Sequence, residues 1–383
     1  MSERKGPLAG VRFIEMPAIG PGPMCGMLLA DLGADVLRIE RPERADIGIE
    51  RPLETNFIMR GRTTIKLDLK KPEGVTLLLR LLREADGLIE GFRPGVMERL
   101  GLGPEPCLAA NPRLIYGRIT GWGQSGPLAK TAGHDLNYIA LTGALHAMGR
   151  KSEAPPVPLN LIGDFGGGAL FLALGLLAGI LEARQSGKGQ VVDAAIVDGV
   201  AAMLTSINGL MACGVSSQER GTNILDSGAY FYDTYQCADG GYVAVGPIEK
   251  RFYALFLEKL GLSVTEMPAQ DDQARWPQGR ERLRSIFLAR PRDEWAALFT
   301  GTDACVTPVL SLQESFSDPH MTARGSYIDV AGYRQAAPAP RFDRTVPDQP
   351  TPPVPARDAD ALSGWLTEAE CRALRKAGTI IYP

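Results

Sequence analysis

The fold is decided by residues 11–40, which read VRFIEMPAIGPGPMCGMLLADLGADVLRIE. The apolar stretch from Val11 to Met16 predicts a short strand, and alternating glycine and proline at residues 20–23 end it. Helical spacing of apolar residues from Met24 to Leu32 predicts a helix, and residues 35–40 return to a strand pattern. A strand, a helix and a second strand in this order favour two parallel strands joined by a helical crossover.

The same alternation continues through the first half of the chain. It predicts strands at residues 64–69, 87–92, 114–120 and 190–196, and helices at residues 72–84, 95–100 and 165–185. Strands that alternate with helices imply a parallel sheet covered on both faces. The sequence therefore predicts an α/β fold.

The pattern changes after about Leu225. Two strand-like stretches, residues 230–236 and 242–245, predict a hairpin around an Asp-Gly turn, and a helix-rich stretch follows from Glu249 to Phe299. Proline-rich segments at residues 336–341 and 347–357 indicate an extended connection before a predicted helix at residues 366–377. We expect a large domain at residues 1–200 completed by 335–383, a linker helix at 201–224, and a small α+β domain at 225–334.

Composition narrows the class of protein. The 383 residues carry a formal net charge of −3, which argues against nucleic acid as the main partner. Six cysteines lie far apart without a Cys-x-x-Cys pair, which is typical of reduced thiols rather than of disulfides or a zinc site. The first residues lack the apolar core of a signal peptide, and the run from Ala169 to Leu181 is shorter than the roughly 20 residues that a bilayer requires. We expect a soluble, cytoplasmic protein that uses no metal and no membrane.

Two segments hold the residues best suited to proton transfer, GHDLNY at residues 133–138 and GDFGGG at residues 163–168. An imidazole and a carboxyl group that face each other could take a proton from one side of a carbon and return one to the other. Taken singly, His134 before a helix is typical of a structural histidine, which is how we interpret His146 and His320. Asp164 alone is typical of a helix N-cap.

The candidate ligand-binding residues are basic. The glycines of residues 20–26 do not have the dinucleotide spacing, and two prolines remove backbone donors, so a tight turn is favoured over a nicotinamide site. Four basic residues at or near strand ends fit a ligand with several phosphates, either coenzyme A or another nucleotide: Arg41, Lys70, Arg93 and Arg99. Each one alone is typical of a solvated surface charge.

A family resemblance adds to these patterns. Over nearly its whole length the chain resembles the α-methylacyl-CoA racemases of the family III CoA-transferase superfamily. The matching segments are residues 20–23, 32–36, 67–70, 92–101, 121–124, 133–138, 160–168, 187–193 and 246–249.

The resemblance implies a large Rossmann-like domain and a smaller domain in an interlocked homodimer, with the active site shared between subunits. It implies an acyl-CoA epimerase of lipid metabolism that needs no cofactor, with coenzyme A as part of the substrate. His134 and Asp164 match the two catalytic bases, and Glu249 matches a glutamate that partners the histidine. The positions that match the coenzyme A and thioester site are Arg41, Leu67, Asp68, Leu69, Lys70, Gly91, Phe92, Arg93, Arg99, Gly133, Asp135, Leu136, Asn137 and Tyr138.

Two alternatives stay open. A CoA transferase of the same superfamily would use Asp135 as a nucleophile that attacks the thioester, although that branch has an aromatic residue where this chain has His134. A module that only binds acyl-CoA would exchange no α-proton. Branched fatty acids, sterol side chains and aryl-propionates fit the sequence equally well as the acyl group.

The racemase hypothesis makes two further demands on the segment around Asp164. Backbone N–H groups where Asp164 opens its helix are expected to hold the enolate oxygen. Asp164 must also be protonated part of the time. Burial beside Phe165 would raise its pKa, whereas a helix N-terminus would lower it.

Overall fold

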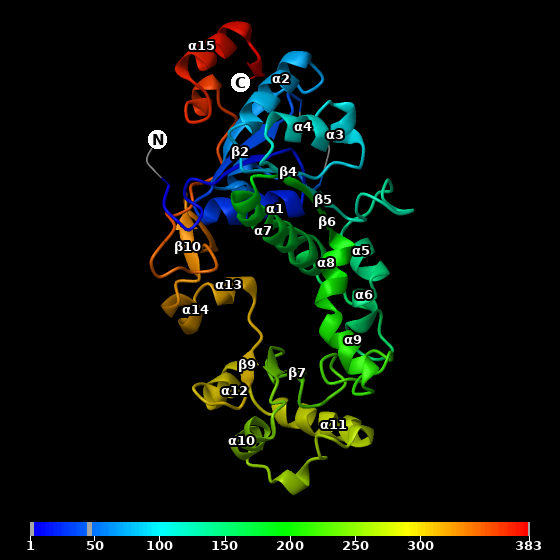
Figure 1. The fold of residues 1–383 in the computed structure, drawn as a ribbon. Helices are drawn as coiled ribbons and strands as arrows, with labels where there is room; N and C mark the ends of the chain where they lie inside the picture. The colour runs from blue at the N-terminus through cyan, green and yellow to red at the C-terminus, as the bar shows by residue number, and fades with distance from the viewer. Residues whose placement is uncertain (1–3, 44–47, 382–383) are drawn as a thin grey trace. The chain divides into compact units, whose positions relative to one another are not determined.

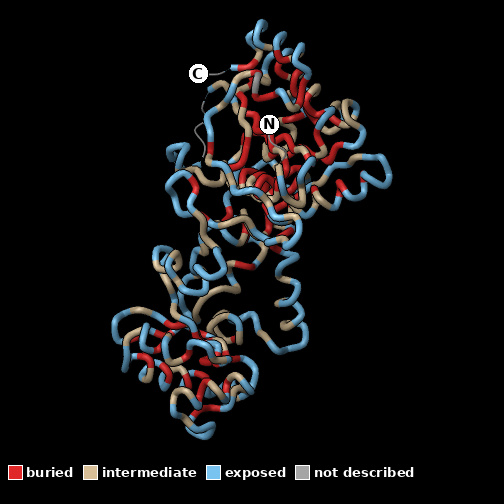
Figure 2. Tube along the Cα trace, turned by 90° about the vertical axis from the view of Figure 1, so that its left-hand side faces the viewer, coloured by how far each residue is buried: buried red, intermediate tan, exposed pale blue. Residues whose placement is uncertain are grey.

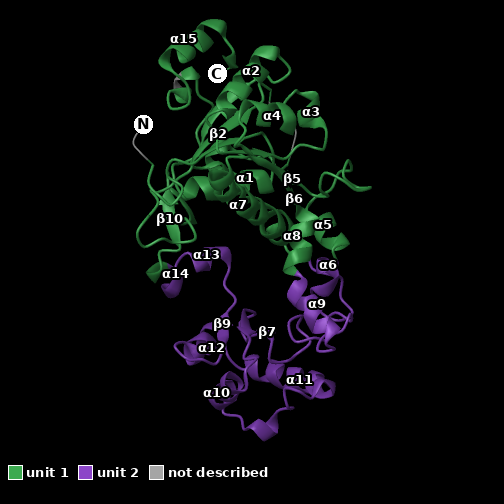
Figure 3. Cartoon of the chain, viewed as in Figure 1, with its two compact units in different colours: residues 1–142, 158–203, 322–383 green, residues 143–157, 204–321 purple. Residues whose placement is uncertain are grey.

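The computed structural model describes residues 4–43 and 48–381. The chain divides into two compact units, shown in Figure 3. The larger unit comprises Met1–Thr142, Pro158–Met203 and Thr322–Pro383, and the smaller unit comprises Gly143–Val157 and Leu204–Met321. Residues 143–157, which the sequence placed in the large domain, therefore pack with the smaller unit.

The larger unit is built on a seven-stranded sheet with the order β12-β3-β2-β1-β4-β5-β6 (Figure 1). All neighbours are parallel except β12 and β3. The α/β prediction is confirmed, and the predicted strands differ from the observed ones by at most a few residues. The strands are β1 Arg12–Glu15, β2 Asp35–Glu40, β3 Thr63–Leu67, β4 Gly87–Glu90, β5 Ile115–Thr120, β6 Gln190–Ala195 and β12 Ile380–Ile381.

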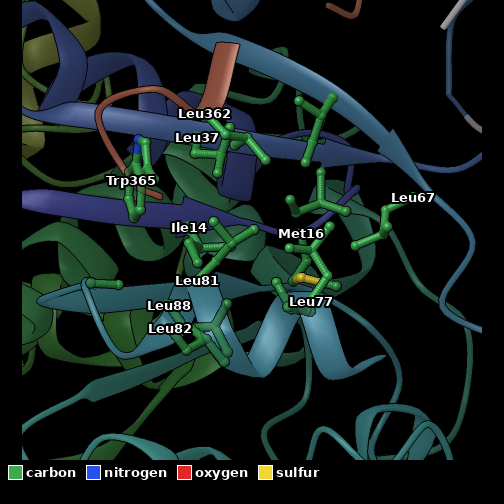
Figure 4. Packing of buried hydrophobic residues seen from close by; sticks show 14 of the residues in the cluster. Ile14, Met16, Leu37, Leu67, Leu77, Leu81, Leu82, Leu88, Leu362 and Trp365 are labelled. Atoms are coloured by element: carbon green, nitrogen blue, oxygen red, sulfur yellow. The ribbon is translucent and has the colours of Figure 1, made fainter. Parts of the chain in front are cut away.

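Helices cover this sheet, and α2 and the C-terminal segment build much of its core. Leu77, Leu81 and Leu82 of α2 share one buried cluster with Leu362 and Trp365, part of which Figure 4 shows. Each fully buried leucine contributes about 1.5–3 kcal/mol. The helices of the larger unit are α1 Pro21–Asp31, η1 Leu53–Thr55, η2 Phe57–Met59, α2 Pro72–Leu82, α3 Val96–Arg99, α4 Pro104–Ala110, α5 Asp135–Leu141, η3 Leu161–Leu170, α7 Phe171–Ser186, α8 Ile196–Met203, η6 Ala359–Leu362 and α15 Glu368–Ala377.

The long helix after residue 160 differs from its prediction. It begins at Leu161 with ten residues of π-helix, η3, and continues as α7. A Cβ atom on Gly199 would lie 1.9 Å from the Gly167 carbonyl oxygen, so only glycine lets α8 approach η3 this closely. The joined helix has 26 residues and contains an 18-residue window with a mean hydropathy of 1.8, so it is long and apolar enough to cross a membrane by length and composition alone. The helix is therefore longer than the apolar run from Ala169 to Leu181 on which the expectation of a segment too short for a bilayer was based.

The smaller unit contains a three-stranded antiparallel sheet of β7 Asp233–Gln236, β8 Tyr242–Val245 and β9 Val306–Pro308. The predicted hairpin is confirmed as β7 and β8. Aromatic side chains fill its core, among them Tyr230, Phe256 and Phe287. Figure 2 shows that buried residues gather separately in each unit. The helices here are α6 Ala144–Ala147, α9 Thr205–Ala212, α10 Lys250–Leu260, η4 Val264–Glu266, η5 Gln273–Arg275, α11 Trp276–Phe287, α12 Arg292–Phe299 and α13 Leu312–Ser315.

Two connecting regions differ from the sequence prediction. The linker helix predicted over residues 201–224 is wrong: this range holds the end of α8, which stops at Met203, and α9 Thr205–Ala212, and residues 213–224 are not helical. After α14 Pro319–Ala323, an antiparallel pair forms from β10 Tyr327–Val330 and β11 Tyr333–Ala336. The sequence indicated only an extended connection from residue 336.

Candidate functional site

The candidate site lies at the carboxyl edge of the large sheet. The strand order reverses at β1, whose neighbours are β2 and β4, and ligands of open α/β sheets bind at such a point. Arg41 follows β2, Lys70 follows β3, and the loop with Arg93 follows β4. Parallel strands end at the same edge, so the sheet brings these three cations to one side of the larger unit.

The basic side chains are available to a ligand. Arg41, Lys70, Arg93 and Arg99 are all exposed. The Arg41 guanidinium lies 5.4 Å from the centre of the Phe92 ring, a cation–π contact between two residues that the resemblance assigned to the same site. Arg99 lies on the short helix α3. The geometry therefore supports a phosphate-binding edge formed by β2, β3 and β4.

A buried ionic network supports the loop after β4, and the sequence analysis missed it. The Glu90 carboxylate, which is 0% exposed, accepts the Phe92 N–H at 2.8 Å and the Arg118 Nε–H at 2.8 Å. Arg118 also pairs with Glu98 of α3 at 2.9 Å. Burial raises the pKa of Glu90, while the bonds from Phe92 and Arg118 oppose that shift. A charged residue that ends an apolar strand is the signal that could have identified Glu90.

His134 is the N-cap of α5, and its side chain is exposed. The backbone N–H of His134 donates to Asn137 Oδ1 at 3.0 Å, which fixes the backbone at this point. The Tyr138 hydroxyl donates to the Gly133 carbonyl oxygen. A Cβ atom on Gly121 would lie 2.0 Å from the Tyr138 ring, so this ring sits directly on the chain that leaves β5. These contacts hold His134 at the carboxyl edge of the sheet.

Asp164 lies inside the first turn of η3, whose N-cap is Asn160, so the expectation that Asp164 opens the helix is wrong. Its Oδ2 atom accepts the Asn160 Nδ2–H at 3.4 Å. Burial raises the pKa of Asp164 to about 6; the charge of Asp135 adds to this, while Asn160 and His134 oppose it. Burial is thus the largest cause of the raised pKa. His134 and Asp164 are close enough for the histidine charge to act on the carboxyl group.

Asp135 holds the segment of Asp164 by its side chain. It is 4% exposed, and its Oδ2 atom accepts the Asp164 N–H at 2.6 Å. Gly163 also lies against this carboxylate, since a Cβ atom on it would be 2.6 Å from Oδ2. The Asp164 amide is therefore occupied, which corrects the expectation that its N–H is free to hold an enolate oxygen.

The remaining predicted residues of the binding edge have different surroundings. Leu67 is 1% exposed within the core, so only its backbone can meet a ligand, and Leu69 packs against the same cluster. Asp68 Oδ1 accepts the Lys70 N–H at 3.0 Å. A Cβ atom on Gly91 would lie 3.1 Å from the Ala18 methyl group, which shows how closely the loops after β1 and β4 approach. Leu136 and Asn137 are exposed on α5.

An apolar depression of about 520 Å³ flanks α5. Asn137, which binds the His134 backbone, lies on its wall. Apart from Thr131, the other residues of this wall are apolar: Trp122, Leu128, Ala132, Ala140 and Leu141.

Glu249 belongs to the smaller unit, where it is the exposed N-cap of α10. Burial and the charge of Glu249 both raise the pKa of Cys305. Within residues 4–43 and 48–381, no group of three or more His, Cys, Asp or Glu side chains could hold a metal ion.

Comparison with known proteins places this chain in a family. The model of CoA-transferase family III matches residues 8–361. The chain is 45% identical to "Alpha-methylacyl-CoA racemase" of Mus musculus and 42% identical to that of Homo sapiens, in each case over 94% of this chain and 91% of the relative. A crystal structure of a CAIB/BAIF family protein from Brucella suis superposes with a TM-score of 0.78 at 27% identity, covering 96% of this chain and all of that one. The chain belongs to CoA-transferase family III.

Proposed function

We propose that this protein is a racemase that interconverts the two C2 epimers of 2-methylacyl-CoA thioesters. One arrangement carries the proposal: Asp135, which directly follows His134, accepts the Asp164 N–H at 2.6 Å and so brings the segments of the two bases together. Burial raises the pKa of Asp164 to about 6. Two bases that share one proton need a carboxyl group that is neither permanently ionised nor permanently neutral. The identity to the mouse and human racemases supports the same assignment.

The proposed reaction transfers a proton at the α-carbon. The thioester carbonyl acidifies the α-hydrogen, so the chemistry uses no cofactor. In one direction neutral His134 takes the proton, an enolate forms, and protonated Asp164 delivers a proton to the opposite face. In the reverse direction ionised Asp164 takes the proton and the imidazolium returns one. Each acid or base step contributes roughly 10²–10⁴-fold to the rate.

The basic edge of the sheet is the proposed site of coenzyme A. Arg41, Lys70, Arg93 and Arg99 would bind its phosphates, and Phe92 offers a ring beside Arg41. We place the acyl chain in the apolar depression beside α5, because its wall includes Asn137 and it therefore adjoins His134.

The homodimer and the role of Glu249 are part of the proposal. Leu170, Leu174 and Leu181 are 55%, 64% and 61% exposed on one side of the η3–α7 helix. A row of exposed leucines at helical spacing is typical of a surface that another chain covers. Glu249 would then partner His134 as the family resemblance implies, orienting the ring and favouring its imidazolium form.

The test is α-proton exchange. Either epimer of a 2-methylacyl-CoA, incubated with the protein in D₂O, should gain deuterium at C2 and converge on the same mixture of epimers. Full activity in a His134→Ala variant would refute the two-base scheme. Rapid transfer of labelled CoA to a free acid, without deuterium uptake, would indicate a transferase instead. Coenzyme A binding with neither reaction would indicate a binding module.

A further inference from the structure

We propose that the Asp135 carboxylate is a positioning residue that ties the segment of His134 to the segment of Asp164. The inference deepens the proposed racemase function and rests on it. Asp135 is the first residue of α5 and follows His134 directly. Its Oδ2 atom accepts the Asp164 N–H at 2.6 Å, so one residue fixes the spacing of both bases.

The surroundings of Asp135 are built for this contact. The side chain is buried, and α5 packs on η3. A Cβ atom on Gly163 would lie 2.6 Å from Asp135 Oδ2, so glycine is needed for the carboxylate to reach the Asp164 amide. Hydrogen bonds to an ionised acceptor are roughly twice as strong as neutral ones. The link is therefore a short, charged clamp between α5 and η3.

Asp135 affects the reacting groups by its charge as well as by its position. The titratable groups that act on Asp164 are Asp135 and His134, both from α5. On the other elements packed around it, Asn160 offers a neutral amide and Gly20, before α1, offers no side chain. Tyr138 lies near both carboxyl groups, whose charges together with burial raise its pKa to about 12.

This role differs from the two that the sequence offered for Asp135. A nucleophile must present a free oxygen to the thioester, and a coenzyme A contact must face the ligand. Oδ2 instead holds Asp164, and Oδ1 is buried without a partner among the described residues. A role of Asp135 as nucleophile or as coenzyme A contact would therefore have to use Oδ1. The test below separates these two roles from the positioning role.

The test compares two variants of the full chain. Asp135→Asn keeps an oxygen for the Asp164 N–H but removes the charge. Gly163→Ala keeps the charge but displaces the carboxylate. Asp86→Asn is the matched control, since Asp86 also accepts a backbone N–H, that of Arg12 at 2.8 Å, at the opposite end of the sheet.

The expected results differ between the variants. The pH profile of kcat/KM should be bell-shaped and the same for both epimers. The reason is that the ratio of the kcat/KM values in the two directions must equal the equilibrium constant between the epimers at every pH. Asp135→Asn should move the bell to lower pH by about half a unit or more, with KM unchanged. Gly163→Ala should lower kcat roughly 10–100-fold and move the bell less, since misplacing a base by about 1 Å can cost 100-fold. Asp86→Asn should match the wild type.

Other outcomes would overturn the inference. A tenfold higher KM with an unmoved bell would assign Asp135 to coenzyme A binding, on the scale of roughly 1.4 kcal/mol per tenfold. If the wild type transfers labelled CoA to a free acid and Asp135→Asn abolishes this transfer, Asp135 is the nucleophile. Titration of the Asp164 carboxyl carbon by ¹³C NMR needs no turnover, so it tests the link even if the wild type fails to racemise. An unchanged Asp164 titration in Asp135→Asn would refute it.

Discussion

Gly20 controls the space beside the proposed acid, and its substitution by alanine tests the site most directly. Gly20 precedes α1 with a φ of +64°, a conformation that glycine adopts readily. A Cβ atom there would lie 2.9 Å from Asp164 Oδ2. Gly20→Ala therefore places one methyl group against the Asp164 carboxyl group while leaving both bases unsubstituted.

The structure gives the size of both effects. With φ +64° and ψ −113°, this conformation strains alanine by about 1–3 kcal/mol, which should lower the melting temperature by about 1–4 °C for a chain of 383 residues. The Asp164 carboxyl group must move by about half an ångström to reach an ordinary contact distance. A displacement of about 1 Å can cost 100-fold, so we expect kcat to fall roughly tenfold while KM stays within threefold.

The assay is deuterium uptake at C2 together with the melting temperature. Gly143→Ala is the control, because Gly143 is also a helix N-cap with positive φ but has nothing within 4 Å of an added Cβ. It should show the loss of stability without the loss of kcat. Equal kcat values for Gly20→Ala, Gly143→Ala and the wild type would refute the placement of Asp164 in the reaction.

Four further predictions follow from the same geometry. Asp164→Asn should abolish exchange yet raise the free energy of unfolding by about 1–3 kcal/mol at pH 8, because the wild-type carboxyl group is then ionised while buried; the gain should shrink below pH 6 and is measured by thermal melts at both pH values. Glu90→Gln should raise the KM for acyl-CoA by roughly fivefold or more with little change in kcat, since it loosens the loop of Arg93 but spares both bases; an unchanged KM would contradict the supporting role of Glu90. Leu174→Glu should convert the proposed dimer to a monomer in light scattering and reduce exchange, whereas Arg184→Glu, at the polar end of the same helix, should leave that dimer intact. Ala140→Trp should lower kcat/KM for long acyl chains more than for 2-methylpropanoyl-CoA, and equal losses would remove the depression from the acyl site.

The large sheet was predictable because its strands are short apolar runs between clear turn signals. Asp35–Glu40 was predicted at both ends, since Gly33 precedes it and Pro42 follows. By contrast, β12 has only two residues and pairs antiparallel with β3, which lies more than 300 positions earlier. No local pattern marks so short a strand, because its identity depends on an edge that only the folded sheet provides.

The same distinction applies to the site. His134 and Asp164 stood out by residue type and glycine context, and the cations by their places at strand ends. Which force controls Asp164 could not be read from the chain, because burial is a property of the packing of η3. Glu90 and Arg118 were missed for the same reason. A single charge in a strand does not reveal the partner that sits on the next strand.

The discontinuity of the larger unit has a consequence for biosynthesis. Residues 204–321 are one uninterrupted piece of the smaller unit, whereas the larger unit needs residues 322–383, made last, for Leu362, Trp365 and β12. During translation, the smaller unit can therefore fold before the larger unit is complete. Until residues 322–383 are made, the larger unit still exposes the apolar residues that pack beneath α2 and the unpaired edge of β3. A chain truncated after Met321 should therefore contain a protease-resistant smaller unit and an unfinished large sheet.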